Sequence, residues 1–195
     1  MRFRFLRWNW LLGLAWLPAP MPGFAMSPAA SADFQSIADL PLQSSDGLSV
    51  TLAVPSGVKL HVLCFLGSEC PLAKLYGPRL DGMARQYADR QVRFFGVNSN
   101  IQDSLDDVLS YVEDHELSFP VVKDHDRKLA LSLGATRTPE VFVVDAQGIV
   151  RYQGRIDDQY QPGVARPEPT EHDLRRAIDE LLSGASVSIP RTESV

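Results

Sequence analysis

The chain has 195 residues, of which 45% are hydrophobic and 22% are charged, a composition that suits one well-buried domain and leaves little room for two. Lysine and arginine together number 19 against 24 aspartates and glutamates, so the formal net charge is −5 at pH 7. An acidic chain without a basic stripe is a poor nucleic-acid binder, and we expect no nucleic-acid partner.

The first 32 residues have the layout of a secretory signal peptide. Three arginines among the first seven residues precede an apolar stretch at Trp10–Leu17, and a small-residue triplet ends at Ala32. The apolar stretch is shorter than the ~20 residues that a membrane span needs. We predict cleavage after Ala32, with Ala25 as the alternative, and an exported, periplasmic domain over residues 33–184. This domain would meet the membrane only through an uncleaved signal.

The first half of the domain is predicted to hold a hairpin, two core strands and a helix. An Asp46-Gly47 turn between two short apolar runs predicts a hairpin or an edge strand. Residues 58–67, VKLHVLCFLG, read as a core strand, and a helix is predicted over residues 71–89. Residues 92–100, VRFFGVNSN, are of the nearly continuous apolar type that a sheet covered on both faces requires.

The second half alternates helices and strands. Ser104 and Asp107 form an approximate capping box at the start of a helix over residues 104–116. The remaining elements are a strand over 119–124, a short helix over 126–134, two strands within 141–155, and a helix over 170–184 capped by Thr170. This order predicts an α/β fold with a central mixed β-sheet and helices on both faces, followed by a flexible tail over residues 185–195.

The two cysteines of the chain are predicted to differ in role. Cys64 lies inside the first core strand and Cys70 past its end, and strand residues about 3.3 Å apart carry the two Cα atoms beyond the ~7 Å limit for a disulfide. Pro71 favours a helix start directly after Cys70, where free main-chain N–H groups stabilise a thiolate. We therefore expect Cys70 to be a nucleophile and Cys64 to fill the core.

Two segments carry a family resemblance. Residues 62–80, VLCFLGSECPLAKLYGPRL, resemble the strand, loop and active-site helix of the thioredoxin superfamily, and residues 136–145, TRTPEVFVVD, resemble its cis-proline loop and following strand. The extra β-α unit over 92–122 is similar to that of the redoxin, or AhpC/TSA-like, group and of exported thiol reductases of cytochrome maturation. The likeness covers roughly residues 33–184 and implies a thioredoxin-like fold with a β-α insertion.

The resemblance also implies site residues. Cys70 falls at the attacking cysteine, and Thr138 and Pro139 fall at the loop that docks the partner chain, with Glu140 directly after them, where it would contact a partner or oppose the thiolate. Asp103 resembles an acid that relays protons beside the cysteine in some exported thiol reductases, although a carboxylate there also suits a helix start. The implied partners are protein or small-molecule thiols and disulfides, and no cofactor is implied.

Position 73 departs from the dithiol pattern. A dithiol enzyme carries its second cysteine there, whereas this chain has Ala73 in the motif Cys-Pro-Leu-Ala. A mixed disulfide at Cys70 then needs an external thiol to resolve it. The sequence therefore predicts monothiol-disulfide exchange.

Two alternatives remain open. A one-cysteine, peroxiredoxin-like antioxidant peroxidase would need a Ser or Thr at Gly67 and an arginine at Pro139, although Ser68 and Arg137 lie nearby in sequence. A non-enzymatic binding module would retain the fold with Cys70 vestigial.

Other polar residues give weaker signals. Asp157, Asp158 and Tyr160 lie in GRIDDQY, which we interpret as a solvated turn rather than as part of the site. The four histidines are scattered, and Cys70 alone makes a poor copper ligand set, so no metal site is predicted.

Overall fold

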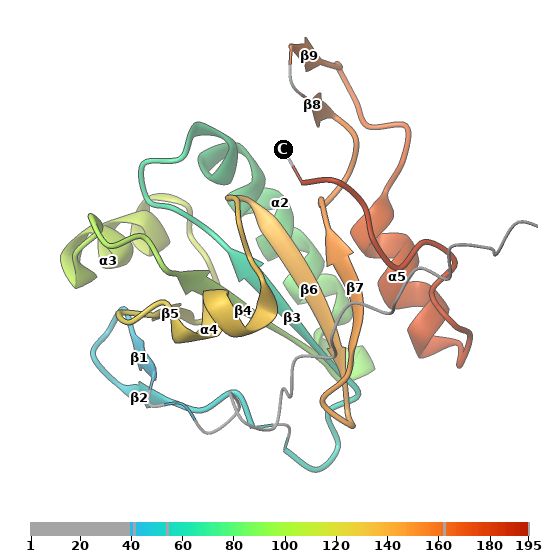
Figure 1. The fold of residues 1–195 in the computed structure, drawn as a ribbon, viewed down its shortest axis with the longest axis horizontal. Helices are drawn as coiled ribbons and strands as arrows, with labels where there is room; N and C mark the ends of the chain where they lie inside the picture. Colours follow the sequence, from blue (N-terminus) through green and yellow to red (C-terminus); the bar gives the residue numbers. More distant parts are fainter. Residues whose placement is uncertain (1–39, 41, 54, 162, 195) are drawn as a thin grey trace, which may run out of the picture. The chain divides into compact units, whose positions relative to one another are not determined.

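Seven strands form one mixed sheet (Figure 1). The computed structural model describes residues 40, 42–53, 55–161 and 163–194, and the predicted signal peptide lies outside these described residues. The strands are β1 Leu42–Ser44, β2 Ser49–Val50, β3 Leu60–Phe65, β4 Val92–Asn98, β5 Val121–Lys123, β6 Glu140–Asp145 and β7 Val150–Gly154. They lie in the order β2-β1-β5-β4-β3-β6-β7. A separate hairpin pairs β8, Tyr160–Gln161, with β9, Val164–Ala165.

Strands β3, β4 and β5 run parallel, and the other neighbours in the sheet pair antiparallel. Parallel neighbours need a crossover connection. Helix α2, Pro71–Tyr87, and the short 3₁₀ helix η1, Ala88–Arg90, join β3 to β4, and α3, Leu105–Asp114, joins β4 to β5. The predicted mixed sheet is therefore confirmed.

Helices cover both faces of the sheet, as predicted. In β3, Val62 and Cys64 pack with α2, α3 and α5, Asp173–Leu182, whereas Leu63 and Phe65 pack with α4, Lys128–Leu133. Every residue of β3 is buried, which explains why its sequence is nearly continuous in apolar residues. In the part of the chain that the structure covers, no helix is both long and apolar enough to cross a bilayer.

Local signals in the sequence located several element ends correctly. The β1–β2 hairpin turns at Gly47, which adopts a left-handed backbone with φ +82°. The capping box at α3 is present in full, because the Ser104 hydroxyl accepts from Asp107 N and the Asp107 carboxylate accepts from Ser104 N. Gly134 and Gly184 follow α4 and α5 with positive φ, as helix-ending residues do.

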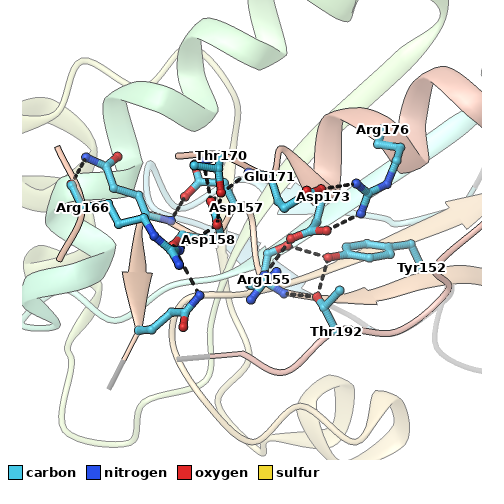
Figure 2. Close-up of polar contacts among 12 residues, drawn as sticks. Tyr152, Arg155, Asp157, Asp158, Arg166, Thr170, Glu171, Asp173, Arg176 and Thr192 are labelled. Atoms are coloured by element: carbon cyan, nitrogen blue, oxygen red, sulfur yellow. Dashed lines mark hydrogen bonds and ion pairs between the residues drawn. The ribbon is translucent and has the colours of Figure 1, made fainter. Parts of the chain in front are cut away.

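The predicted solvated turn at Asp157 and Asp158 is wrong, because both carboxylates are buried. Asp158 accepts hydrogen bonds from Thr170 N at 2.7 Å, Thr170 Oγ1 at 2.6 Å and Glu171 N at 2.9 Å (Figure 2). The main-chain N–H of Glu171 and the hydroxyl of Thr170 hold the pKa of Asp158 below its ordinary value. Because the Thr170 hydroxyl serves Asp158, the predicted Thr170 cap is also wrong, and α5 begins at Asp173 after His172.

Residues 188–194, within the segment 185–195 that was predicted as a flexible tail, lie along the domain. Gln153 N donates to Pro190 O and Thr192 N donates to Gln153 O, each at 3.0 Å, so this segment adds a short parallel bridge to β7. Figure 2 shows Tyr152 and Arg155 meeting Thr192, whose hydroxyl lies 2.7 Å from the Tyr152 hydroxyl and accepts from Arg155 N at 3.0 Å. We call residues 188–194 the docked tail.

Candidate active site

Cys70 stands at the N-cap position of α2, with Pro71 as the first helical residue. The loop that leaves β3 turns back through a hydrogen bond from Cys70 N to Gly67 O at 3.1 Å, and Lys74 N donates to Cys70 O at 3.0 Å to open the helix. Cys70 is partly exposed and carries a free thiol. The chain therefore presents this sulfur at the positive end of a helix of 17 residues.

The predicted cis-proline loop lies against this sulfur. Cys70 Sγ is 3.1 Å from the carbonyl oxygen of Thr138, to which an S–H group donates. The Thr138–Pro139 peptide bond is cis. Two segments 68 residues apart in sequence thus meet at one point, as the resemblance to the thioredoxin superfamily implied.

Cys64 has no access to this site. Its side chain is fully buried between β4 and β6, where it pairs in register with Gly96 and Val141. Both cysteines are free, in agreement with the expectation that they form no disulfide, and burial raises the pKa of Cys64 far above that of an exposed thiol. Cys64 is a core residue.

Ala73 occupies the position of the second cysteine of dithiol enzymes and packs in the core between α2 and α3. Ala73 is fully buried on α2, and its carbonyl oxygen accepts a hydrogen bond from the Tyr111 hydroxyl of α3 at 2.7 Å. Burial raises the pKa of Tyr111 well above its ordinary value, so this hydroxyl keeps its proton. Ala73 helps to fasten α2 to α3 and brings no chemistry to Cys70.

Asp103 is buried behind the Cys70 loop and contacts that loop through Ser68. Its carboxylate accepts from Ser68 N at 2.9 Å, from Asn98 Nδ2 at 2.6 Å and from Asn100 Nδ2 at 2.9 Å. Its hydrogen bonds come from these donors rather than from Cys70 Sγ. The structure therefore brings Asp103 to the same end of the sheet as Cys70, where it braces the main chain two residues before the sulfur.

A buried lysine that the sequence reading missed completes this network. Lys123, at the end of β5, donates from Nζ to Asn98 Oδ1 at 2.8 Å and to Asn100 O at 2.5 Å. Burial lowers the pKa of Lys123, and neighbouring carboxylates, chiefly that of Asp103, oppose this shift. The sequence signal that could have predicted a buried lysine here is its position at the end of the apolar run FPVVKD.

Pro139 and Glu140 follow the residue that the loop presents to Cys70, and Glu140 is buried. The Glu140 carboxylate accepts from Thr136 N at 2.9 Å and from Gln153 Nε2 at 3.0 Å. Both of its oxygens are thus used to hold the loop to β7. Of the three residues predicted to bind substrate, Thr138 lies beside Cys70.

A groove of about 590 Å³ opens beside Cys70. Its walls are the loop that follows β4, the start of α4 and the Thr138 loop. The lining residues are Phe65, Gly67, Glu69, Cys70, Ser99, Asn100, Ile101, Gln102, Arg127, Ala130, Ala135, Thr136, Arg137 and Thr138. Cys70 and Thr138 were predicted at this site, and Arg137 was named for the peroxidase alternative, whereas Arg127 and the residues of the 99–102 loop were not predicted.

The two residues that could equip a peroxidase make their hydrogen bonds elsewhere. The Ser68 hydroxyl accepts from Asn98 Nδ2 at 3.4 Å, behind the Cys70 loop. The Arg137 guanidinium donates to the carbonyl oxygen of Ser194 at 2.9 Å. Both side chains thus bond to groups other than Cys70 Sγ.

Residues 35–153 match the AhpC/TSA family. The chain belongs to the AhpC/TSA family. This match includes Cys70, Asp103 and the Thr138 loop, so the resemblance seen in the sequence is confirmed.

Curated relatives of this family member include two proteins named thiol:disulfide interchange protein DsbE. The chain is 31% identical to the Allochromatium vinosum protein over 107 residues, which cover 51% of this chain and 56% of that one. It is 28% identical to the Xylella fastidiosa protein over 145 residues, which cover 73% of this chain and 66% of that one. The chain thus spans less than two thirds of the length of either relative.

Solved structures place this family member among thioredoxin-like folds. A hypothetical protein, SMc02350 from Sinorhizobium meliloti, matches with a TM-score of 0.73 and 29% identity over 82% of this chain and 88% of that one. A secreted Mycobacterium tuberculosis disulfide oxidoreductase matches with a TM-score of 0.51 and 22% identity over 59% and 82%. A Xanthomonas campestris peroxiredoxin Q variant matches with a TM-score of 0.54 and 20% identity over 61% and 81%; these last two show the fold alone.

Proposed function

We propose that this chain is an exported thiol redox protein that exchanges disulfides through one cysteine, Cys70. The observation that carries the proposal is a free thiol at the start of α2, open to a groove and in contact with the Thr138 loop, while the other thiol, Cys64, is sealed in the sheet. The similarity to proteins named thiol:disulfide interchange proteins supports the same class of substrate.

The first step forms a mixed disulfide. The Cys70 thiolate attacks one sulfur of a substrate disulfide R1–S–S–R2, the Sγ–S bond to R1 forms, and the S–S bond breaks. The R2 thiolate leaves and takes a proton from water. The positive end of the α2 dipole favours the thiolate form of Cys70, and we propose that the Thr138 loop positions the substrate backbone beside it.

Resolution requires external thiols. A thiolate R3–S⁻ attacks Sγ, so that R1–S⁻ leaves and Cys70 becomes joined to R3. A second R3–S⁻ attacks the R3 sulfur of this adduct, which forms R3–S–S–R3 and restores the Cys70 thiolate. One disulfide is reduced and two R3 thiols are oxidised to one disulfide, so the electrons balance.

Asp103 and Glu140 support this site from behind. We propose that Asp103 holds the Cys70 loop through Ser68 N, and that Glu140 holds the Thr138 loop through Thr136 N. The sequence predicted instead that Asp103 relays protons. The variant Asp103→Asn distinguishes this role from a positioning role. A positioning role lowers the exchange rate equally at all pH values, whereas a relay alters the shape of the pH profile.

Alkylation of the mature protein by iodoacetamide tests the nucleophile. We expect Cys70 to react in the folded protein far faster than the buried Cys64, and we expect Cys70→Ser to remove the reaction. Cys64→Ala is the matched control, which should retain the reaction and the mixed disulfide with oxidised glutathione, detected by mass spectrometry. An equal alkylation rate in Cys70→Ser, or the absence of the mixed disulfide in Cys64→Ala, would contradict the proposal.

The two alternatives make different expectations. A one-cysteine peroxidase would form a sulfenic acid at Cys70 far faster than a free thiol does, which stopped-flow mixing with hydrogen peroxide measures. A binding module would capture the same partners with and without Cys70→Ser. We expect slow peroxide oxidation and loss of disulfide-linked partners in the variant.

Export is the second part of the proposal and rests on the layout of the first 32 residues. We expect the protein in the periplasmic fraction with a new N-terminus after Ala32 or Ala25. Mass determination of the intact protein recovered from that fraction tests this. Recovery of the full-length chain from the cytoplasm would contradict it.

A further inference from the structure

The groove beside Cys70 is lined by two arginines that have no carboxylate partner among the residues that the structure describes. Most arginines in the described ranges form an ion pair with a carboxylate, namely Arg79, Arg85, Arg90, Arg151, Arg155, Arg166 and Arg176. Arg127 and Arg137 line the groove and form no such pair within these ranges. Arg93, Arg175 and Arg191 also form no ion pair in these ranges but lie outside the groove, so the groove is distinguished by having two such arginines together.

Both arginines are placed by main-chain contacts. Arg127 adopts a left-handed backbone with φ +56° at the N-cap of α4, and Arg127 N donates to Asp124 O at 3.1 Å. The Asp124 carboxylate is used elsewhere, because it accepts from Leu129 N at 3.2 Å and from Ala130 N at 3.0 Å. Arg137 donates to the carbonyl oxygen of Ser194, a neutral group. Each guanidinium thus keeps its charge available.

The other lining residues do not cancel this charge. Glu69 supplies the one carboxylate among the lining residues, and Lys74 lies 3.2 Å from it. Asp103 and Glu140 are buried behind the loops and line no part of the groove. The lining of the groove thus carries two guanidinium groups and one carboxylate, a balance of charge that favours an anionic ligand.

We propose that the thiol that resolves Cys70 is a low-molecular-weight thiol that carries carboxylates, bound by Arg127 and Arg137. This inference rests on the proposed function, because Ala73 leaves resolution to an external thiol. Guanidinium groups bind carboxylates through paired hydrogen bonds, and a volume of about 590 Å³ suits a molecule the size of a short peptide. R3 is then the anionic thiol, and its sulfur attacks Sγ while its carboxylates bind the arginines.

The first test compares two alkylating reagents of similar size and different charge. Iodoacetate is an anion and iodoacetamide is neutral, so the ratio of their rates at Cys70 reports the charge of the groove without any disulfide chemistry. We expect Arg127→Gln and Arg137→Gln each to lower this ratio about three-fold at low salt. The control is Arg175→Gln, which removes a cation that hydrogen-bonds Gln86 on α2 and lies outside the groove. It should leave the ratio unchanged.

The second test measures resolution itself. Cys70 is first converted to its mixed disulfide with neutral 2-mercaptoethanol, and release of the protein thiol is then followed with 3-mercaptopropionate or with 2-mercaptoethanol at equal thiolate concentration. We expect the anionic thiol to react about ten-fold faster, and each arginine variant to lower that rate while leaving the rate of the neutral thiol unchanged. The difference should shrink as salt is added.

The outcomes separate the anionic-thiol proposal from the proposed function. Equal rates for the two thiols, or equal loss of both rates in the variants, overturn the anionic-thiol proposal and leave disulfide exchange intact. An unchanged alkylation ratio in both arginine variants overturns it as well. Failure of Cys70 to form any mixed disulfide overturns the proposed function, whereas a lowered alkylation ratio would still identify the groove as an anion site.

Discussion

The groove beside Cys70 and the region around Asp158 and Asp173 use the same charged residue types in opposite ways. In the second region Asp158 pairs with Arg166 and accepts from main-chain and hydroxyl donors, and Asp173 pairs with Arg155 and Arg176 (Figure 2). We call its members, Arg155, Asp158, Arg166, Asp173 and Arg176, the acid–arginine cluster. Its charges are satisfied within the chain and serve stability, whereas the groove arginines retain charge for a ligand.

The docked tail contacts both regions. Thr192 meets Tyr152 and Arg155 at the edge of the acid–arginine cluster, and Ser194 O accepts from Arg137 in the groove. A change that displaces the tail should therefore affect stability and groove charge together. A change confined to one region should affect one property alone.

Gly154→Ala should have the largest effect on stability. Gly154 has φ +149°, and a Cβ there would lie 2.6 Å from Thr192 O and 2.9 Å from Thr192 N, so the tail or the strand must move. We expect a loss of about 3 kcal/mol in the free energy of unfolding, measured by denaturant titration, and faster hydrogen exchange in residues 188–194.

Gly57→Ala is the control for this variant. Gly57 also has a positive φ, +94°, but nothing lies within 4 Å of the point that an alanine Cβ would occupy, so about 1 kcal/mol is expected from backbone strain alone. Equal losses for the two variants would show that the tail is not packed on Gly154.

Asp173→Asn should weaken the acid–arginine cluster by about 2 kcal/mol, because Asp173 is buried and accepts from Arg155 Nε at 2.6 Å and from Arg176. Asp126→Asn, which removes an exposed pair with Lys128, should change the free energy of unfolding by less than about 0.5 kcal/mol. Neither variant should alter the ratio of alkylation rates at Cys70. A change in that ratio as large as that of Arg137→Gln would erase the distinction between the two regions.

His61 should make stability depend on pH without involving either region. It is fully buried beside Phe95, and burial, with a smaller contribution from Arg93, lowers its pKa to about 4. The unfolded chain, with a histidine pKa near 6.5, binds more protons between pH 6.5 and 4, so stability falls as the pH falls through this window.

Between pH 7.5 and pH 5 this loss amounts to about 2 kcal/mol. His61→Phe should flatten the dependence of unfolding free energy on pH, whereas His125→Gln, at an exposed position, should not. Denaturant titrations at the two pH values measure it. An unchanged slope in His61→Phe would assign the pH dependence to other groups.

Glu69→Gln should have the smallest effect. The Glu69–Lys74 pair is exposed, so stability should change by less than about 0.5 kcal/mol. Loss of the carboxylate should raise the iodoacetate to iodoacetamide ratio at Cys70 by up to about two-fold, and Lys74→Gln should lower it. Changes of this rate ratio in the opposite direction would contradict the proposal that the charge of the groove controls how fast an anion reaches Cys70 Sγ.

Local rules predicted the strands of the main sheet, the α2 start and the position of Cys70, but not the β8–β9 hairpin. A continuous apolar run and Pro71 encode these features within a few residues, and the resemblance added the contact with Thr138. The capping box at Ser104 was predicted for the same reason, since its two partners are three residues apart.

Features that depend on distant partners were not predicted. No residue next to Asp158 in the sequence indicates that Arg166 and Thr170 will contact its carboxylate. A turn with two adjacent aspartates was therefore predicted to be solvated. Thr170 was misread as a helix cap for the same reason. The two arginines of the groove were not predicted as an anion site. Whether an arginine has a carboxylate partner depends on the tertiary structure, which the sequence around Arg127 and Arg137 does not specify.

The buried position of Ser194 has a practical consequence for handling the protein. The Ser194 side chain is buried, and its carbonyl oxygen accepts a hydrogen bond from Arg137. A truncation that removes Ser194, or a tag inserted before it, would therefore disturb the groove without removing any strand of the sheet. A tag inserted directly before residue 33, after the predicted signal peptide, would leave the contact between Ser194 and Arg137 undisturbed.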